Sequence, residues 1–103
     1  MNWNTHKSKK FIDAVLLLET RNQAQKFLRD IMTQKEIDEF STRFQAADML
    51  TQGFSYKAII AKTGLSSTTV ARVSKWLNGS EGGYRFILHK LHKHQRSSGL
   101  ELS

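Results

Sequence analysis

Apolar residues recur at helical spacing along most of the chain, and no stretch alternates apolar with polar residues over the length of a strand. A period of about 3.6 residues indicates helices, whereas strict alternation indicates strands. The chain also contains no proline, the residue that most strongly interrupts a helix. The pattern therefore predicts an all-α fold.

The first predicted helix, at about residues 9–19, is apolar on nearly every side. A helix of this kind must be covered all round. A chain of 103 residues fits one domain, residues 1–103, and is a modest size for burying such a helix alone. We therefore expect a second copy of the chain to supply the cover, which makes the protein a homodimer.

Two more helices are expected before the middle of the chain. Thr20 can cap the second helix, since a threonine hydroxyl accepts a hydrogen bond from a free amide of the first turn. Thr33 and Glu36 have the spacing of a capping box at the start of the third helix. Gly53 suits the left-handed position after its end. Residues 9–54 are thus predicted to be dimerisation helices.

Residues 55–78 have the pattern of two short helices joined by a glycine turn. Ser55 can cap the first helix and Ser66 the second, and Gly64 supplies the positive φ that such a turn often requires. We predict a helix-turn-helix. Its inner face is expected to carry Ile59, Ile60, Leu65, Val70, Val73 and Leu77. Its outer face is expected to carry Ser67, Thr68, Ala71 and Lys75, with Thr69 and Arg72 at the flank.

The C-terminal part contains one loop and one helix. The stretch NGSEGG after the helix-turn-helix is the obvious loop. Apolar residues from Tyr84 to Leu91 then follow at helical spacing, so the last helix is predicted at residues 84–93. Residues 95–103 show no periodicity and are expected to be a frayed tail.

The charge of the chain narrows the choice of partner. Sixteen Lys and Arg oppose nine Asp and Glu, which gives a net charge of +7 and a pI of about 10.0. Such a balance favours an anionic partner, either nucleic acid or an anionic membrane surface. No acidic residue occurs between Met49 and Ser80, while Lys57, Lys62, Arg72 and Lys75 are all basic. A surface that faces phosphates needs this one-sided charge.

The N-terminus superficially suggests a signal peptide. However, Asp13 interrupts the apolar run, Glu19 closes it and no small-residue cleavage site follows. No stretch approaches the roughly 18 apolar residues of a membrane span. We therefore expect a soluble, cytoplasmic protein with no membrane partner. The absence of cysteine excludes disulfides, Cys-based zinc sites and thiol catalysis.

The hydroxyl-rich start of the second short helix suits a DNA major groove. The N-terminal part of this helix enters the groove in helix-turn-helix proteins. Short hydroxyl side chains allow close approach and can bond base edges or phosphates, and the helix N-terminus attracts a phosphate. The alternative is an ordinary helical corner in which Ser and Thr serve only as caps. The acid-free basic stretch and the net charge favour DNA binding.

The segment TGLSSTTVARVSKWLNGSEGGYRFIL resembles the Trp repressor superfamily, in particular its TrpR-related members of the YerC/YecD type. The resemblance covers nearly the whole chain. It implies a six-helix domain interlocked with a second copy, and an operator with two related half-sites. It also places Ser67, Thr68 and Ala71 at base edges and Lys57 at phosphate. The predicted contacts to double-stranded DNA are Lys57, Ser66, Ser67, Thr68, Thr69, Ala71, Arg72 and Lys75.

The resemblance also implies an effector pocket, because the best-known member of the superfamily senses free L-tryptophan between two arginines. These arginines match Arg43 and Arg72, and a threonine of the pocket matches Thr33. Val73 stands where that member has glycine, and Trp76 where it has serine. We hypothesise that Trp76 and Val73 fill the space of the ligand, so that no tryptophan is required. Alternatively, Trp76 is an aromatic residue of the core or of the dimer interface.

Other chemistry finds little support. His89 and His92 lie three residues apart and could hold a transition metal. No carboxylate stands near them in sequence, and a basic, solvated helix end is the preferred interpretation. The scattered Asp and Glu residues form no catalytic pattern, and GSEGG lacks the strand and lysine of a phosphate-binding loop. We predict neither a metal site nor an enzyme.

The predicted function is that of a sequence-specific DNA-binding transcriptional regulator, a repressor that acts as a dimer. Two alternatives stay open at the level of the sequence. One is a DNA-targeting module of a recombination or replication complex, because a fold does not fix a function. The other is a helical protein-interaction module whose charge is incidental.

Overall fold

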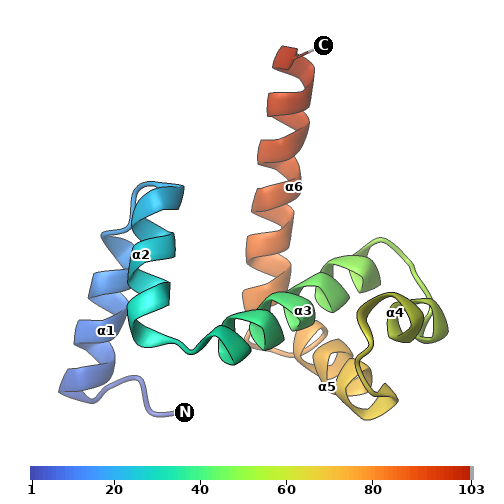
Figure 1. The fold of residues 1–103 in the computed structure, drawn as a ribbon, viewed down its shortest axis with the longest axis horizontal. Coiled ribbons are helices and arrows are strands. Elements are labelled where there is room, and N and C mark those ends of the chain that lie inside the picture. The colour runs from blue at the N-terminus through green and yellow to red at the C-terminus, as the bar shows by residue number, and fades with distance from the viewer. Residues whose placement is uncertain (103) are drawn as a thin grey trace. The chain divides into compact units, whose positions relative to one another are not determined.

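The computed structural model describes the backbone of residues 1–102 and the side chains of residues 1–95. Over residues 1–102 the chain forms six helices and no strand, which confirms the predicted all-α class (Figure 1). The helices are α1 (His6–Leu16), α2 (Arg21–Ile31), α3 (Gln34–Thr51), α4 (Tyr56–Thr63), α5 (Ser67–Leu77) and α6 (Gly83–Leu102). The chain divides into two compact units, Met1–Ile37 and Asp38–Ser103, here called the N-terminal and C-terminal units.

In the N-terminal unit, α1 and α2 begin at hydroxyl caps. Thr20 accepts a hydrogen bond from the Gln23 amide at 3.1 Å, as predicted. Thr5 accepts one from the Ser8 amide at 3.2 Å, so α1 starts three residues before the predicted position. The two helices run side by side, with the rings of Phe11 and Phe27 at a centroid distance of 6.1 Å (Figure 1).

The predicted capping box is present at the start of α3. The Glu36 amide donates to Thr33 Oγ1 at 3.1 Å, and the Thr33 amide donates to Glu36 Oε1 at 2.9 Å. Hydrogen bonds from the backbone and then the side chain of Thr33 lower the pKa of Glu36, because they stabilise its charged form. After α3 the chain turns at Gly53, whose φ of 86° confirms the left-handed conformation.

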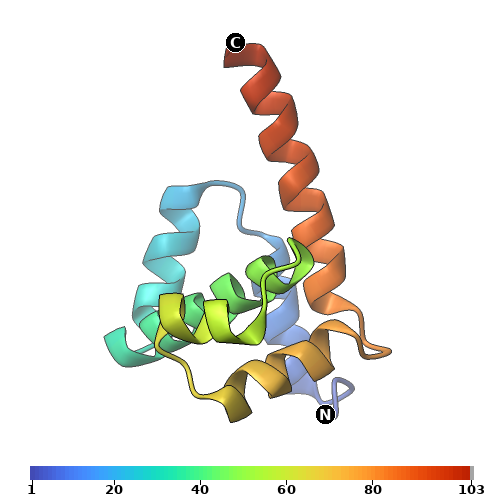
Figure 2. The ribbon, with the colours of Figure 1, turned by 90° about the vertical axis from the view of Figure 1, so that its right-hand side faces the viewer.

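The core of the C-terminal unit is built from one face of each of its helices. The fully or almost fully buried residues are Ala46, Ala47, Ile59, Val70, Val73, Leu77 and Leu88. Tyr84 packs against this cluster, and the centroid of its ring lies 6.4 Å from the centroid of the Phe44 ring. α4 packs against α5 and α5 against α6, and Figure 2 shows α6 leaving this group and projecting beyond it.

The last helix is longer than predicted. It runs from Gly83 to Leu102 instead of residues 84–93, and the predicted frayed tail is helical as far as Leu102. The physical reason is that extending an existing helix avoids the cost of nucleation, and no proline follows residue 93. Ser103 lies outside the described residues. Among the described helices, none is both long and apolar enough to cross a membrane.

Candidate nucleic-acid interface

The helix-turn-helix consists of α4, the three-residue turn 64–66 and α5. Ser55 caps α4 by accepting from the Ala58 amide at 3.1 Å, and Ser66 caps α5 by accepting from the Thr69 amide at 3.1 Å. Gly64 ends α4 in the left-handed region at a φ of 76°. All three local predictions are confirmed, because short-range hydrogen bonds and backbone preference define them.

The inner face of this pair also matches the prediction. Ile59, Val70 and Val73 have no exposed surface, and Leu77 is almost fully buried. Ile60 and Leu65 are partly buried against the same cluster. The inner face therefore fixes α4 and α5 to the rest of the C-terminal unit and leaves their other sides free.

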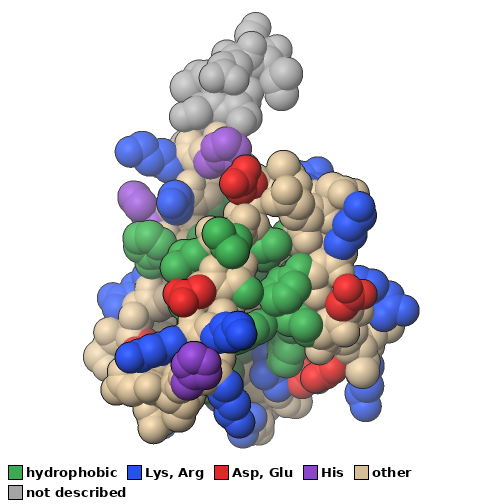
Figure 3. Space-filling model, turned by 90° about the vertical axis from the view of Figure 1, so that its left-hand side faces the viewer, with side chains coloured by type: hydrophobic (Ala, Val, Ile, Leu, Met, Phe, Trp, Pro, Cys, Tyr) green, Lys and Arg blue, Asp and Glu red, His purple; other side chains and the backbone are tan. Residues whose placement is uncertain are grey.

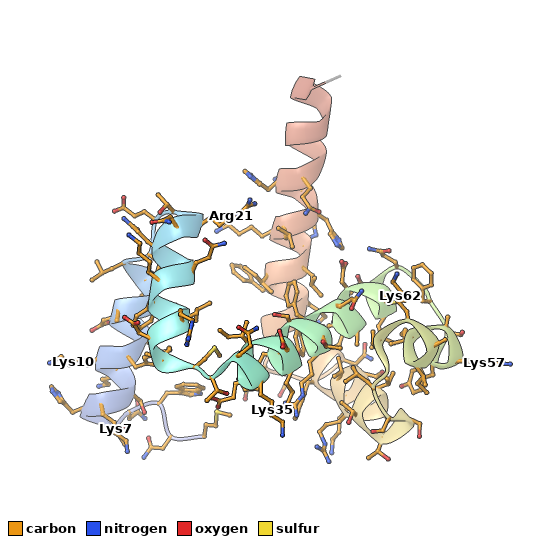
Figure 4. All side chains as sticks on the ribbon, viewed as in Figure 1. Lys7, Lys10, Arg21, Lys35, Lys57 and Lys62 are labelled. Carbon is orange, nitrogen blue, oxygen red and sulfur yellow. The ribbon has the colours of Figure 1, made fainter. Side chains whose placement is uncertain are left out.

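The outer face of α5 is open to solvent. Ser67, Thr68, Ala71 and Lys75 are all exposed, whereas Thr69 is half-buried. Ser66 and Arg72 are exposed as well. On α4, the Lys57 side chain points away from the body of the unit (Figure 4). Apart from Thr69, the predicted contact residues are thus exposed, and the stretch that contains them has no acidic residue.

The hydroxyls near the turn differ in how many hydrogen bonds they make within the chain. Ser66 Oγ donates to Thr69 Oγ1 at 3.0 Å in addition to capping α5. The hydroxyls of Ser67 and Thr68 make no hydrogen bond with another residue in the part of the chain that the structure describes. These two side chains therefore remain available to an external partner.

The residues of the implied effector pocket have different surroundings in the structure. Thr33 serves as the cap of α3 in the N-terminal unit. Arg43 pairs with Glu39 at 2.8 Å, and its guanidinium lies 5.8 Å from the centroid of the Phe40 ring. Val73 is buried in the core, and Arg72 is exposed. No hydrogen bond or ion pair joins Arg43, Arg72 and Trp76 within the described residues.

Trp76 borders an open hollow in the single chain. Its side chain is 45% exposed. The hollow has a volume of about 570 Å³, and its aromatic and aliphatic lining includes Phe44, Trp76, Tyr84 and Ile87. Burial raises the pKa of Tyr84, and the positive charge of Arg43 partly opposes that rise.

One side-chain contact joins residues that lie far apart in the sequence. His92 Nε2 lies 2.6 Å from Asp48 Oδ1, although 44 residues separate them. His92 therefore has a carboxylate neighbour, Asp48 of α3, although no carboxylate lies near it in the sequence. A local sequence pattern cannot predict a contact over this separation. Among the described residues, no group of three or more His, Cys, Asp or Glu side chains could hold a metal ion.

The fold and this face define a class: an all-helical protein with an exposed, basic helix-turn-helix. The model of the Trp repressor protein family matches residues 6–92, and the chain belongs to that family. The uncharacterised protein YerC of Bacillus subtilis strain 168 is 29% identical over 86 residues, which are 84% of this chain and 83% of that protein.

Two solved structures extend this similarity to three dimensions. A TrpR-like protein of Eubacterium eligens ATCC 27750 superposes with a TM-score of 0.81 at 34% sequence identity, covering 87% of this chain and 93% of that one. A protein of Staphylococcus aureus described as a candidate Trp repressor gives a TM-score of 0.82 at 32% identity, covering 89% and 95%. These matches confirm the resemblance to TrpR-related proteins and the six-helix fold.

Proposed function

We propose that this protein is a sequence-specific DNA-binding transcriptional repressor that acts as a homodimer on a two-fold operator in the cytoplasm. Membership of the Trp repressor protein family supports a regulator that binds DNA. The observation that carries the proposal is the division of α5 into a buried face and an exposed face. Val70, Val73 and Leu77 anchor the helix, while Ser67 and Thr68 stay exposed and unpaired within the described chain.

This division suggests how α5 meets a duplex. Its N-terminal turn enters the major groove, where the Ser67 and Thr68 hydroxyls bond base edges and the Ala71 methyl contacts a thymine methyl. The positive end of the helix and the cap at Ser66 face a phosphate. Lys57, Arg72 and Lys75 neutralise further phosphates, which sets the position of the helix without specifying sequence.

The dimer is proposed because the helices of the N-terminal unit are poorly covered. Neither α1 nor α2 contains a buried residue. Leu16 and Leu17 are each 76% exposed, and Phe11, Leu28 and Ile31 are also exposed. Figure 3 shows hydrophobic side chains gathered in patches on the face it presents. Such patches mark association surfaces, and a second copy of the chain supplies complementary ones.

We also propose that DNA binding requires no tryptophan. Val73 closes the core where the tryptophan-sensing member has glycine, and Arg43 pairs with Glu39 through Nη2, with its Nε lacking a hydrogen-bond partner. Adding L-tryptophan should therefore change neither the melting temperature nor the DNA affinity. A large gain in either quantity would contradict this part of the proposal.

The proposed function is tested by selecting bound sites from random duplex DNA and measuring affinity at several salt concentrations. We expect a two-fold consensus, and a binding constant that falls steeply with salt because bound phosphates release counterions. Lys57→Ala and Lys75→Ala should each reduce the slope of log affinity against log salt by about 1. Lys26→Ala, on α2, is the matched control and should leave the slope unchanged.

The same experiment separates this proposal from its rivals. Ser67→Ala and Thr68→Ala should change the selected sequence without changing the salt slope, because they remove base contacts but no charge. If no consensus emerges and the lysine variants bind DNA as the wild type does, the protein is not a sequence-specific DNA-binding protein. An interaction module whose charge is incidental would give that result.

A further inference from the structure

Thr63, the last residue of α4, has a hydroxyl that both donates and accepts a hydrogen bond within the helix-turn-helix. Its Oγ1 donates to the Ile59 carbonyl oxygen at 2.7 Å and accepts from the Leu65 amide at 3.2 Å. A threonine hydroxyl has a single hydrogen to donate, so its donor capacity is used within the chain. The side chain is also half-buried, which separates it from the exposed Ser67 and Thr68.

These two hydrogen bonds connect the core to the turn. Ile59 is completely buried, so its carbonyl belongs to the fixed part of α4. Leu65 follows the left-handed Gly64, and its amide is the next donor after the Gly64 amide, which bonds to Ile60 at 2.9 Å. Without the Thr63 hydroxyl the half-buried Leu65 amide loses its acceptor, and an unpaired buried donor is costly.

The position of Leu65 determines where α5 begins. Leu65 packs against the core cluster, and the next residue, Ser66, caps α5 through the Thr69 amide. Ile59 is therefore connected to the first turn of α5 through the Thr63 hydroxyl and then through the successive residues Leu65 and Ser66. A change of a few degrees at this turn displaces the exposed side chains of the first turn of α5 relative to a base pair.

We infer that Thr63 is a positioning residue, whose hydroxyl sets the angle at which α5 leaves the turn and thereby the base preference of Ser67 and Thr68. This inference rests on the proposed function, because base preference exists only if α5 reads DNA. Thr63 itself contacts no DNA. Its effect is transmitted through the Leu65 amide and the cap at Ser66.

The experiment compares Thr63→Val, which keeps the branched shape but removes the hydroxyl, with Thr63→Ser, which keeps the hydroxyl. The preference of each variant for the selected site over random duplex is measured at one salt concentration. Thr63→Val should lower this preference about tenfold, the discrimination that a base contact provides, with the non-specific affinity unchanged. Thr63→Ser should restore the preference, because both hydrogen bonds can form again.

Thr42 provides a matched control on α3. Its hydroxyl donates to the carbonyl of Asp38, four residues earlier, at 2.7 Å, which is the same bond that Thr63 makes to Ile59. The Thr42 hydroxyl has no amide partner in a turn. Thr42→Val therefore reproduces the loss of the helical bond alone. It should leave the DNA preference unchanged whatever it does to the melting temperature.

Two results would overturn the inference and leave the proposed function intact. One is a Thr63→Val protein that keeps its preference within about twofold while Ser67→Ala changes the selected sequence. The other, which needs no variant to fold, is a Leu65 amide in the wild-type protein that exchanges hydrogen as fast as an unprotected amide. A wild-type protein with no sequence preference at all would instead remove the proposed function, and the inference with it.

Discussion

Single residues on α5 take their roles from the side of the helix on which they lie. Val70 and Val73 are completely buried, while Ala71 and Arg72 between them are exposed. The alternation follows from the helical repeat, since residues three and four apart share a face. One short helix can therefore hold the core together with one set of side chains and offer another set to a partner.

Gly64 should be the least replaceable residue of the turn. Its φ of 76° lies in the left-handed region, which disfavours a side chain by roughly 1–2 kcal/mol. No atom lies within 4 Å of an added Cβ, so the cost of Gly64→Ala is conformational and not steric. Urea unfolding should show a loss of this size. Gly83→Ala, also without a neighbour within 4 Å but without a positive φ, is the control, and equal losses for both would contradict this reasoning.

Tyr84 should make the fold sensitive to alkaline pH. Because burial raises the pKa of its phenol in the folded state, the neutral form is favoured there. The resulting stabilisation is complete below the unfolded-state pKa of about 10 and is lost as the pH rises through the folded-state pKa. The free energy of unfolding of the wild type and of Tyr84→Phe should be measured as the pH rises through these pKa values. The variant should lose less stability than the wild type.

The effect of Arg43 on the same group can be tested separately. Its positive charge favours the phenolate and so opposes the rise in the pKa of Tyr84. Arg43→Met should therefore raise the pKa of Tyr84 further, measured by phenolate absorbance during an alkaline titration. An unchanged or lower pKa would show that Arg43 does not act on Tyr84.

At the scale of elements, hydroxyl caps define where most helices begin. Four helices, α1, α2, α4 and α5, begin at a hydroxyl that accepts a hydrogen bond from the amide three residues later. These hydroxyls belong, in the same order, to Thr5, Thr20, Ser55 and Ser66. The apolar pattern does not predict the cap at Thr5, and α1 begins correspondingly earlier than predicted. The end of α6 was also misplaced, because a helix can continue without an apolar stripe of its own.

The capping box of α3 should contribute measurably to stability. Thr33→Ala removes the acceptor of the Glu36 amide and should cost about 1 kcal/mol in the free energy of unfolding. The folded-state pKa of Glu36 is lowered, so its charged form stabilises the folded protein at pH values above the unfolded-state pKa. This stabilisation is lost as the pH falls through the folded-state pKa. Chemical unfolding at neutral and acidic pH measures both effects.

Glu36→Gln is the companion variant for this element. The amide oxygen of glutamine can still accept from the Thr33 amide, but it carries no charge. The variant should therefore keep much of the stability at neutral pH and show a weaker acid dependence. If it matches the wild type at every pH, the charge of Glu36 has no role in the cap.

At the scale of the whole molecule, the two units differ in how well they bury their apolar residues. The C-terminal unit has a closed cluster that includes residues from all four of its helices, α3 to α6. In the N-terminal unit, α1 and α2 contain no buried residue, and several of their large apolar side chains are exposed. The expected homodimer would supply the cover that the single chain lacks.

Leu16→Glu should dissociate the proposed dimer. Leu16 is 76% exposed in the single chain, and placing a carboxylate in an apolar interface without a partner is strongly unfavourable. Losing the burial of one leucine alone, about 2 kcal/mol, would weaken association more than tenfold. Sedimentation equilibrium measures the change. Gln25→Glu adds the same charge at an exposed polar position of α2 and should leave the dimer intact; a monomeric wild type would refute the proposal.

The sequence by itself determined the helical class, the capping box, the glycine turn and the two faces of α5. These features depend on hydrogen bonds and side-chain spacing within about four residues, which a local pattern records. Only the tertiary structure decided that Asp48 contacts His92, that Trp76 borders an open hollow, and that Thr63 connects Ile59 to Leu65. Such contacts depend on how distant helices pack and on how the chain turns between them, and neither is set by the local sequence.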